Sequence, residues 1–442
     1  MKKWINRRTF LTTSVAAVLG SEFLINSHPS MAQSVSENFK GIRQTIKQTV
    51  ETGSPKSIVI AVAKEGKIIW EEAFGLANRE KRIPASINTR YAISSVSKTF
   101  TATGLMVLVE KGLIRLDDPI SKFLGNMQLT AYAGNVSSVT VKHLLQHTSG
   151  LPRHWRNFYT DEKDLAPSLQ ETIKRYGFIT TVPGEHYNYS NLNYALLSFI
   201  IEKVSGLSFA AFMQRKVFLP LGLIETTIEN NHILSRPAAS LYNSDGTLES
   251  YYTVDESGSQ RVFSTARDLI KFGLFHLKNL QSGQKQIIKP ELIDQMAQEK
   301  QSMEISEDLS LCSALGWITQ EKSKYNYYNL AQSGDAPGVS AQLMILPNEK
   351  IAVAVISNTR SADLIYTITD DVLDCLLPDN KKMRESNPAF KPPLAETSFK
   401  PTTELLGEWS GEIKTYSGTL PATMIFQSDG DVHLKLEGQL ET

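Results

Sequence analysis

Strand-like and helix-like patterns of apolar residues divide this chain into regions of two kinds. Residues 57–63 and 67–74 are strand-forming runs joined by the turn signal Lys64-Glu65-Gly66. Residues 339–346 and 351–357 repeat that arrangement towards the other end of the chain. Because helical patterns occupy the stretch between these two pairs, we predict one antiparallel sheet built from the first and last parts of the chain.

Helical spacing of apolar residues predicts the elements that cover this sheet. Residues 38–52, 95–112 and 361–377 have the period of helices. From residue 153 to about 275 the pattern is again helical and the connections are polar, which predicts an all-α insertion. The expected fold class is therefore α/β, with an antiparallel β-sheet covered by helices plus an all-α insertion.

The two ends of the chain differ from its middle. Residues 1–32 combine the basic pair Arg7-Arg8 with an apolar run that ends in small residues, which predicts a twin-arginine-like signal peptide and an exported protein, periplasmic or extracellular. We expect residues 33–377 to form the main domain and the charged, proline-rich residues 378–403 to be a linker. Residues 404–442 alternate like strands and predict a short C-terminal β-rich tail, which either packs on the main domain or is an incomplete domain.

Composition narrows the range of partners. The chain has 442 residues, 41% of them hydrophobic, and 46 basic side chains balance 46 acidic ones, so it carries no basic footprint for nucleic acid. No segment after the leader is predicted to span a membrane, and the oligomeric state is left open. Neither the spacing of Cys312 and Cys375 nor the pair His143 and His147 predicts a metal site, so we expect no metal and no cofactor.

The candidate chemistry begins where the helix over residues 95–112 starts. Ser95 and Lys98 are three residues apart and therefore share one face of that helix. The unpaired N–H groups and the positive end of the dipole at a helix N-terminus stabilise an oxyanion that forms on a carbonyl attacked by Ser95. A desolvated lysine can remove or relay the proton of a serine hydroxyl, which makes the hydroxyl a nucleophile. An N-capping serine beside an exposed lysine is the alternative interpretation of the same two residues.

Two further short motifs could contribute to such a site. Tyr189-Ser190-Asn191 precedes a predicted helix, where it could contribute polar groups or simply cap the helix. Gln332-Ser333-Gly334, followed by Asp335, lies immediately before the predicted strand over residues 339–346, where its backbone N–H groups could face a pocket or form an ordinary glycine-rich turn.

Taken in order, these motifs resemble those of the β-lactamase-related serine hydrolases, which include class C β-lactamases, penicillin-binding carboxypeptidases, D-amino-acid peptidases and esterases. The resemblance covers roughly residues 56–358. It rests on five segments of the chain: Ser95-Val-Ser-Lys98, Leu113-Ile-Arg-Leu-Asp-Asp-Pro119, His143-Leu-Leu-Gln-His-Thr-Ser-Gly-Leu-Pro152, Pro183-Gly-Glu with Tyr189-Ser-Asn191, and Pro220-Leu-Gly-Leu.

The resemblance implies a role for each matched residue. Ser95 would be the nucleophile, Lys98 its proton partner and Tyr189 the general base, whose anion Lys98 would favour. Asn191 would contact the substrate, as would the third motif, Gln332, Ser333 and Gly334. The backbone N–H groups of Ser95 and Asp335 would be the oxyanion donors. His147 would fix its loop within the matched segment.

The third motif departs from the family pattern, and this departure bears on the substrate. The family usually has Lys or His where this chain has Gln332, so the cation is missing. We therefore expect an exported serine hydrolase that works through an acyl-serine at Ser95 on an ester, amide or β-lactam carbonyl, with neutral acyl esters favoured. The alternatives are a penicillin-binding D-alanyl-D-alanine carboxypeptidase or β-lactamase, and a catalytically silent binder of cell-wall peptides.

Overall fold

The computed structural model describes residues 39–161, 165–228, 238–303, 311–320, 327–377, 379–382, 401–415, 418–428, 431–436 and 439–440. The predicted signal peptide over residues 1–32 and most of the predicted linker over residues 378–403 lie outside these ranges. The predicted domain boundaries therefore stay predictions.

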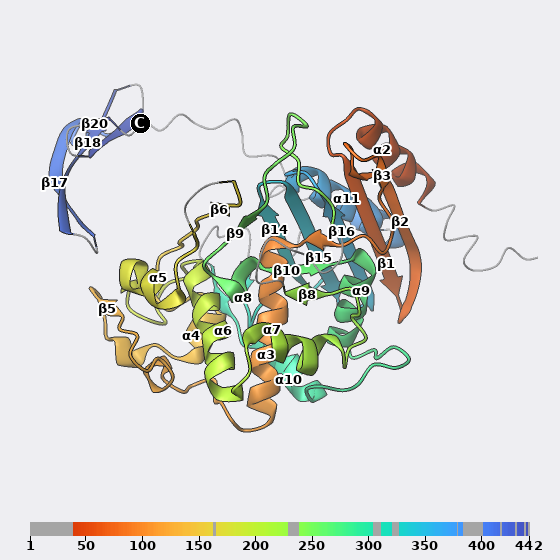
Figure 1. The fold of residues 1–442 in the computed structure, drawn as a ribbon, viewed down its shortest axis with the longest axis horizontal. Helices are drawn as coiled ribbons and strands as arrows, with labels where there is room; N and C mark the ends of the chain where they lie inside the picture. The colour runs from red at the N-terminus through yellow and green to blue at the C-terminus, as the bar shows by residue number, and fades with distance from the viewer. Residues whose placement is uncertain are drawn as a thin grey trace, which may run out of the picture.

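A nine-stranded antiparallel sheet forms the centre of the fold (Figure 1). As predicted, it joins the two ends of the main domain, because the first strand pairs with the last along seven consecutive residue pairs from Ile58↔Ser357 to Lys64↔Ile351. In the order in which they pair, the strands are β11 (Gln301–Ser302), β12 (Leu311–Ser313), β13 (Ile318–Gln320), β14 (Asn329–Ala336), β15 (Val339–Leu346), β16 (Ile351–Ser357), β1 (Ser57–Lys64), β2 (Lys67–Asn78) and β3 (Ile83–Pro84).

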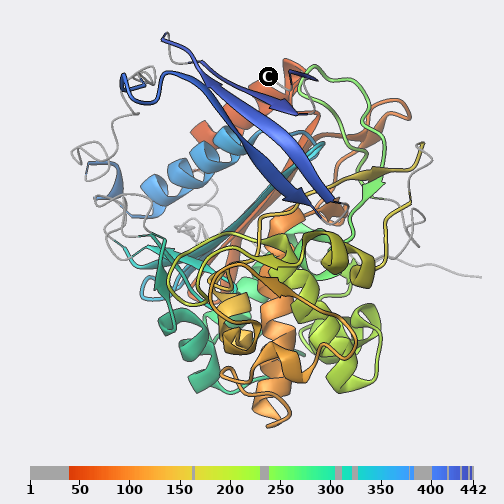
Figure 2. The same cartoon turned by 90° about the vertical axis from the view of Figure 1, so that its left-hand side faces the viewer.

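The two faces of this sheet are covered by different helices (Figure 2). Successive side chains of a strand point to opposite faces. In β1, Ile58 and Ile60 pack in one hydrophobic cluster with α2 (Lys40–Glu51) and α11 (Ala362–Leu376), whereas Val59 and Ala61 belong to the larger core of the helical region. Both faces of β1 are therefore buried, which explains why its apolar run is continuous rather than alternating.

The helical region is organised around α3 (Ser97–Glu110), which contacts α6 and α8 and stands in the middle of the region in Figure 1. Every residue of α3 from Ser97 to Leu108 is buried, as expected for a helix surrounded by others. The remaining helices are α4 (Val141–Leu145), α5 (Leu169–Tyr176), α6 (Asn191–Ser205), α7 (Phe209–Met213), α8 (Ser257–Gln260), α9 (Ala266–His276) and α10 (Pro290–Gln298).

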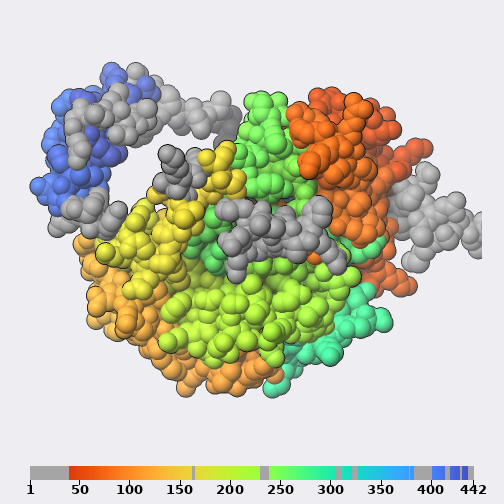
Figure 3. All heavy atoms as spheres, in the orientation of Figure 1, coloured from red at the N-terminus to blue at the C-terminus, as the bar shows by residue number. Residues whose placement is uncertain are grey.

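The predicted insertion is mostly helical, but it also contains short strands. Two-residue and three-residue strands pair β4 (Tyr91–Ala92) with β10 (Val262–Ser264), β10 with β8 (Thr227–Ile228), β5 (Thr130–Ala131) with β7 (Phe178–Ile179), and β6 (Phe158–Tyr159) with β9 (Tyr252–Thr253). Seen as spheres, the red N-terminal elements and the yellow and green helical region form one continuous body (Figure 3).

The C-terminal tail is β-rich, as predicted. Its strands form a separate four-stranded sheet: β17 (Gly407–Thr415), β18 (Gly418–Phe426), β19 (Val432–Leu436) and β20 (Gln439–Leu440). Trp409 and Met424, which face each other across β17 and β18, are 52% and 42% exposed. This sheet therefore leaves large apolar side chains open to solvent, in contrast to the central sheet.

Two further observations concern the cysteines and the membrane. Cys312 and Cys375 are both free thiols, the first buried and the second exposed. Within the described ranges no single helix is long and apolar enough to cross a bilayer, although the bent pair Asn191–Ser205 and Phe209–Phe218 passes that test by length and composition when taken together.

Candidate active site

Ser95 lies in a single 3-10 turn, η1 (Ser94–Val96), that leads directly into α3. The preceding residue, Ser94, has a φ of 43°, an uncommon left-handed conformation for a residue other than glycine. The sequence prediction that Ser95 stands at the start of this helix is confirmed. Its backbone N–H therefore belongs to the group at the helix N-terminus that has no intrahelical acceptor.

Lys98 is fully enclosed one turn later, with an exposed fraction of 1%. Its Nζ donates hydrogen bonds to Ser95 Oγ at 3.1 Å, to Asn191 Oδ1 at 2.9 Å and to the Ser259 carbonyl oxygen at 3.2 Å. An ammonium group has three donors, so all of them have acceptors here. The alternative interpretation of Lys98 as an exposed surface lysine is wrong.

Tyr189 completes a three-residue cluster at the Ser95 hydroxyl. Its phenol OH donates to Ser95 Oγ at 2.9 Å, and Lys98 Nζ lies 4.8 Å from the centre of its ring. Two proton-carrying groups therefore converge on one hydroxyl oxygen, and they come from positions separated by 91 residues of chain, because Lys98 is on α3 and Tyr189 precedes α6.

The His147 ring packs against the ring of Tyr189. The two rings are stacked with centroids 4.4 Å apart, and His147 Nδ1 accepts a hydrogen bond from the backbone N–H of Ser190 at 3.1 Å. Burial, followed by the positive charge of Lys98, holds the pKa of His147 well below its usual range. A neutral imidazole that accepts at Nδ1 connects its own loop to the segment of Ser190, whereas the side chain of His143 caps α4.

Asn191 connects Lys98 to the loop that carries residues 153 and 154. Its side-chain Nδ2 donates to the carbonyl oxygen of His154 at 2.8 Å while its Oδ1 accepts from Lys98. Its backbone N–H donates to the carbonyl oxygen of Arg153 at 3.0 Å. Asn191 therefore has fixed partners on both sides and holds the Lys98 amine in place.

The other wall of the site is β14, which passes directly beside η1. A Cβ atom on Gly334 would lie 2.8 Å from the Ser95 backbone nitrogen and 2.2 Å from the Ile93 carbonyl oxygen. No side chain fits at this position, so glycine keeps the Ser95 N–H uncovered. The prediction that this motif precedes a strand needs correction, because residues 332–336 are themselves part of β14 and pair with β15 in register.

Asp335 turns its backbone and its side chain in different directions. Its carbonyl oxygen lies 3.4 Å from Ser94 Oγ, and since the N–H and C=O of one strand residue point to the same side, its N–H also faces the η1 edge. Its carboxylate instead accepts from Ser340 Oγ and from Arg360 Nε, both at 2.6 Å. The position of the backbone therefore fits an oxyanion donor, and the negative charge is paired with Arg360.

Gln332 and Gly334 share one face of β14 because side chains alternate along a strand. That face is turned towards η1, as the contacts of Gly334 show. Gln332 is buried, and its amide Nε2 donates to the Ser333 carbonyl oxygen at 3.2 Å. The residue at the usual position of a family cation is therefore a neutral amide that lies on the site's side of the strand.

A second cluster of ionisable groups lies behind Asn191. His154 Nε2 is 3.0 Å from Asp255 Oδ1 and 3.5 Å from Glu256 Oε1. Burial would raise the pKa of Asp255, but hydrogen bonds from His154 and Thr172 hold it below its ordinary value. For Glu256, burial and then the neighbouring Asp255 carboxylate raise the pKa to about 8.

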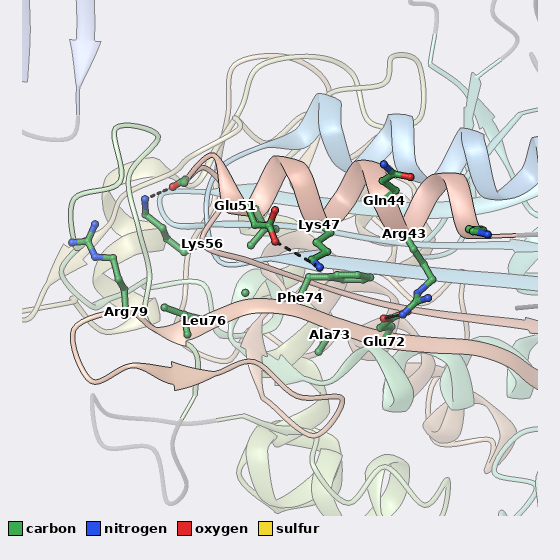
Figure 4. Close-up of a pocket in the computed structure, with 14 residues that line it drawn as sticks. Arg43, Gln44, Lys47, Glu51, Lys56, Glu72, Ala73, Phe74, Leu76 and Arg79 are labelled. Atoms are coloured by element: carbon green, nitrogen blue, oxygen red, sulfur yellow. Dashed lines mark hydrogen bonds and ion pairs between the residues drawn. The ribbon is translucent and has the colours of Figure 1, made fainter. Parts of the chain in front are cut away.

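A basic groove between α2 and β2 is distinct from this site. It is lined by residues of both elements, including Arg43, Lys47, Phe74 and Arg79, and none of the predicted site residues takes part (Figure 4). Arg43 is paired with Glu72 at 2.6 Å, and Lys47 lies 3.9 Å from Glu51. The groove therefore contains paired charges and none of the groups that converge on Ser95.

The structure brings most of the predicted residues together. Ser95, Lys98, Tyr189 and Asn191 form one hydrogen-bonded cluster, and Gly334 and Asp335 adjoin it through the backbone. The Ser259 carbonyl and the cluster of His154, Asp255 and Glu256 were missed by sequence reasoning. The only local signal for the latter was the adjacent acidic pair at positions 255 and 256 ahead of a short helix.

Comparisons with known proteins identify the family of the chain. Residues 42–371 match the model of the Beta-lactamase family, well over half of the chain. The chain belongs to the Beta-lactamase family. It is accordingly a serine hydrolase with the β-lactamase/transpeptidase-like fold, and the resemblance drawn from its motifs is confirmed.

Individual relatives cover most of the same region. Penicillin-binding protein 4* of Bacillus subtilis is 27% identical over 342 residues, which is 71% of each chain. Protein flp of Staphylococcus aureus is 25% identical over 329 residues, and this match spans 72% of the present chain but only 62% of flp.

Solved structures of other proteins are similar to this chain in fold as well. The octameric penicillin-binding protein homologue from Pyrococcus abyssi aligns with a TM-score of 0.68 and 26% identity over 90% of this chain and 88% of its own. A class C β-lactamase aligns with a TM-score of 0.66 and 18% identity over 78% of this chain and 98% of its own, which is a likeness of fold.

Proposed function

We propose that this enzyme hydrolyses neutral acyl esters through an acyl-serine intermediate at Ser95. The observation that carries the proposal is the convergence of Lys98 Nζ and Tyr189 OH on Ser95 Oγ, at 3.1 Å and 2.9 Å. A nucleophile and its base must be within such hydrogen-bonding reach for proton transfer. Lys98 and Tyr189 together can take the serine proton, with Asn191 and the Ser259 carbonyl holding the amine in place.

The reaction would proceed in two halves. Ser95 Oγ forms a bond to the substrate carbonyl carbon as its proton passes to the pair of Tyr189 and Lys98, which for this step must hold one proton fewer than a phenol and an ammonium together. The carbonyl oxygen becomes an oxyanion facing the N–H groups of Ser95 and Asp335. The carbon–oxygen bond to the alcohol then breaks and the alcohol leaves with that proton. Water attacks the acyl-serine in the same way, which releases the acid and restores the Ser95 hydroxyl.

The preference for neutral substrates rests on Gln332. A lysine or histidine at this place could bind a substrate carboxylate through a charge-assisted hydrogen bond, which contributes roughly 1.5–3 kcal/mol. The amide of Gln332 is neutral and already donates to the Ser333 carbonyl. Substrates without a carboxylate should therefore be favoured by about ten-fold or more, since 1.4 kcal/mol corresponds to a factor of ten.

One observation favours a second candidate, a β-lactamase or D-alanyl-D-alanine carboxypeptidase. Arg153 is exposed, and its guanidinium carbon lies 5.6 Å from the centre of the Tyr189 ring. This cation lies beside Tyr189 and could bind the carboxylate that β-lactams and D-alanyl peptides carry. Penicillin-binding protein 4* and the Pyrococcus abyssi penicillin-binding protein homologue are among the similar proteins, which also supports this candidate.

Mass spectrometry of the intact protein tests the acyl-serine directly. A fluorophosphonate should add one adduct to the native enzyme and none to Ser95→Ala. Ser94→Ala, a neighbour whose Oγ makes only 3.4 Å contacts, should keep the adduct and serves as the matched control. An adduct that persists in Ser95→Ala would exclude Ser95 as the nucleophile, and no adduct with any probe would support the catalytically silent peptide binder.

Steady-state kinetics test the substrate. We expect kcat/KM for a neutral short-chain acyl ester to exceed that for a chromogenic cephalosporin. If the native enzyme prefers the cephalosporin and Arg153→Ala removes that preference, the second candidate replaces the first.

Export is also part of the proposal, supported by the basic and apolar pattern of residues 1–32. A mature N-terminus at Gln33 in the exported protein is the expected result of N-terminal sequencing. Export that survives replacement of both Arg7 and Arg8 by lysine would contradict the twin-arginine route.

A further inference from the structure

Three ionisable side chains from distant parts of the chain meet in the interior behind Asn191. His154, Asp255 and Glu256 have side chains that are 5%, 1% and 0% exposed. One donor atom from each lies within 4.8 Å of the others. His154 is 101 residues from Asp255, so the fold and not the local sequence assembles this group.

Glu256 is the member of this group whose carboxylate lacks hydrogen-bond partners. Neither of its carboxylate oxygens has a hydrogen-bond partner, and both are out of contact with solvent. A buried carboxylate without a donor costs several kcal/mol, so such a group takes up a proton or binds a cation. One of its oxygens points at the cluster, because Oε1 is 3.5 Å from His154 Nε2.

The proton of His154 does not satisfy both carboxylates. Its Nε2 lies 3.0 Å from Asp255 Oδ1 and 3.1 Å from Asp255 Oδ2, so a proton on this nitrogen is directed at Asp255. A single N–H group cannot also serve Glu256 at 3.5 Å with good geometry. A cation placed between the three side chains would contact all of them at once.

The separations between donor atoms fit a small divalent ion. Metal–ligand bonds of about 2.0–2.2 Å in a tetrahedral site put neighbouring ligand atoms roughly 3.3–3.6 Å apart. The distances of 3.0 Å and 3.5 Å from His154 Nε2 to the two carboxylates are within a few tenths of an ångström of this range. All three ligand atoms lie within 4.8 Å of one another, so a bound ion would draw the two carboxylates closer together. One imidazole and two carboxylates are ligands of zinc and of the neighbouring first-row metals, and they leave one position open.

The surroundings hold these side chains in place, as the outer shell of a metal site does. Thr172 Oγ1 donates to Asp255 Oδ2 at 2.6 Å. The ring of Tyr176 packs on the His154 ring with centroids 4.3 Å apart. The His154 backbone has a φ of 40°, a strained conformation that the packing of its side chain maintains.

We propose that His154, Asp255 and Glu256 form a binding site for one divalent transition-metal ion of the zinc type. This site is separate from the groups that take part in the proposed ester hydrolysis, and the proposal of a metal site does not depend on that reaction. It adjoins the reacting groups through one link, because the His154 carbonyl oxygen accepts from Asn191, which in turn accepts from Lys98. A bound ion would fix His154 and thereby the position of the Asn191 amide.

Metal analysis of the full-length chain, freed of any affinity tag, tests the proposal. The protein is stripped of metal with EDTA, incubated with ZnCl₂ and desalted. Its zinc content is then measured by elemental mass spectrometry, and the affinity of the stripped protein for zinc by titration calorimetry. We expect one zinc ion per chain and a rise in Tm on binding. Glu256→Gln keeps the shape but removes the charge, and it should weaken binding by at least about 100-fold. Glu65→Gln, at an exposed turn, should bind as the native chain does.

A chain that retains no zinc, or a Glu256→Gln variant that binds as tightly as the native chain, would overturn the proposal. A higher Tm for Glu256→Gln without any metal dependence in the native chain would show that Glu256 is a neutral acid. If Glu256→Gln fails to fold, anomalous scattering at the zinc edge from crystals of the native chain decides. A peak between the three side chains supports the site, whereas peaks only at exposed histidines mean an adventitious ion only and refute it.

Discussion

The two walls of the active site are built from different kinds of structure. The helical wall, which comprises Ser95, Lys98, Tyr189 and Asn191, is a closed set of side-chain hydrogen bonds in which the Lys98 ammonium has three acceptors. The strand wall, residues 332–335 of β14, faces Ser95 with its backbone and with one neutral side chain. The helical wall agrees with the family motif and the strand wall departs from it.

This difference separates the tasks of the two walls. In the proposed mechanism, side chains on the helical wall exchange protons with Ser95, so a change there should reduce the rate for every substrate. Side chains on the strand wall can change without breaking any bond to Ser95 Oγ, so a change there should alter which substrate is preferred. The following variants test that separation, from the largest expected effect to the smallest.

Replacing Lys98 should have the largest effect. Lys98→Met keeps most of the buried volume but removes the amine from Ser95, Asn191 and the Ser259 carbonyl, so kcat/KM should fall at least about 10³-fold for esters and cephalosporins alike. Lys122→Met, on an exposed lysine, is the matched control. The measurement is turnover with both substrates. An effect on one substrate alone would contradict the assignment of rate to the helical wall and of substrate preference to the strand wall.

Tyr189→Phe should come next. The ring keeps its stacking on His147 but loses the hydroxyl that reaches Ser95 Oγ, and loss of a general base costs typically 10²–10⁴-fold in kcat. The fold should be unaffected, which an unchanged Tm would verify. A variant that reacts normally with the fluorophosphonate and hydrolyses the ester at the native rate would show that Lys98 alone accepts the Ser95 proton.

Gln332→Lys should change the preference between the two substrates more than it changes the rate of hydrolysis. The new ammonium on the site's face of β14 could form a charge-assisted hydrogen bond to a substrate carboxylate, so the ratio of kcat/KM for cephalosporin to that for neutral ester should rise about ten-fold. Gln332→Met, which adds no charge, is the control. The account of the strand wall is wrong if the ratio does not move.

Arg360→Ala should have the smallest effect. It frees the Asp335 carboxylate, which an ion pair with Arg360 holds on the far side of β14. The Arg360 side chain is 60% exposed, and an exposed ion pair contributes only about 0–1 kcal/mol to stability. We expect less than a two-fold change in the ratio of the two substrates. A ten-fold loss of cephalosporin turnover would mean that the Asp335 charge reaches the site after all.

The sequence by itself determined the parts of this protein that depend on near neighbours along the chain. Ser95 and Lys98 meet because residues three apart share a helix face, and the hairpin of β1 and β2 follows from two strand-like runs and a short turn. Tyr189 and Asn191 could be proposed only through the resemblance to a family. Nothing in their local pattern indicates that they lie beside Ser95, 94 and 96 residues away.

Only the tertiary structure decided the direction in which charges point. Asp335 is next to Gly334 in the sequence, yet strand alternation and Arg360 place its carboxylate on the opposite face of β14. His154 and the pair Asp255 and Glu256 become one buried cluster because β6 pairs with β9, which brings their loops together. Such contacts depend on which segments pack against each other, and a one-dimensional pattern of polar and apolar residues does not specify that.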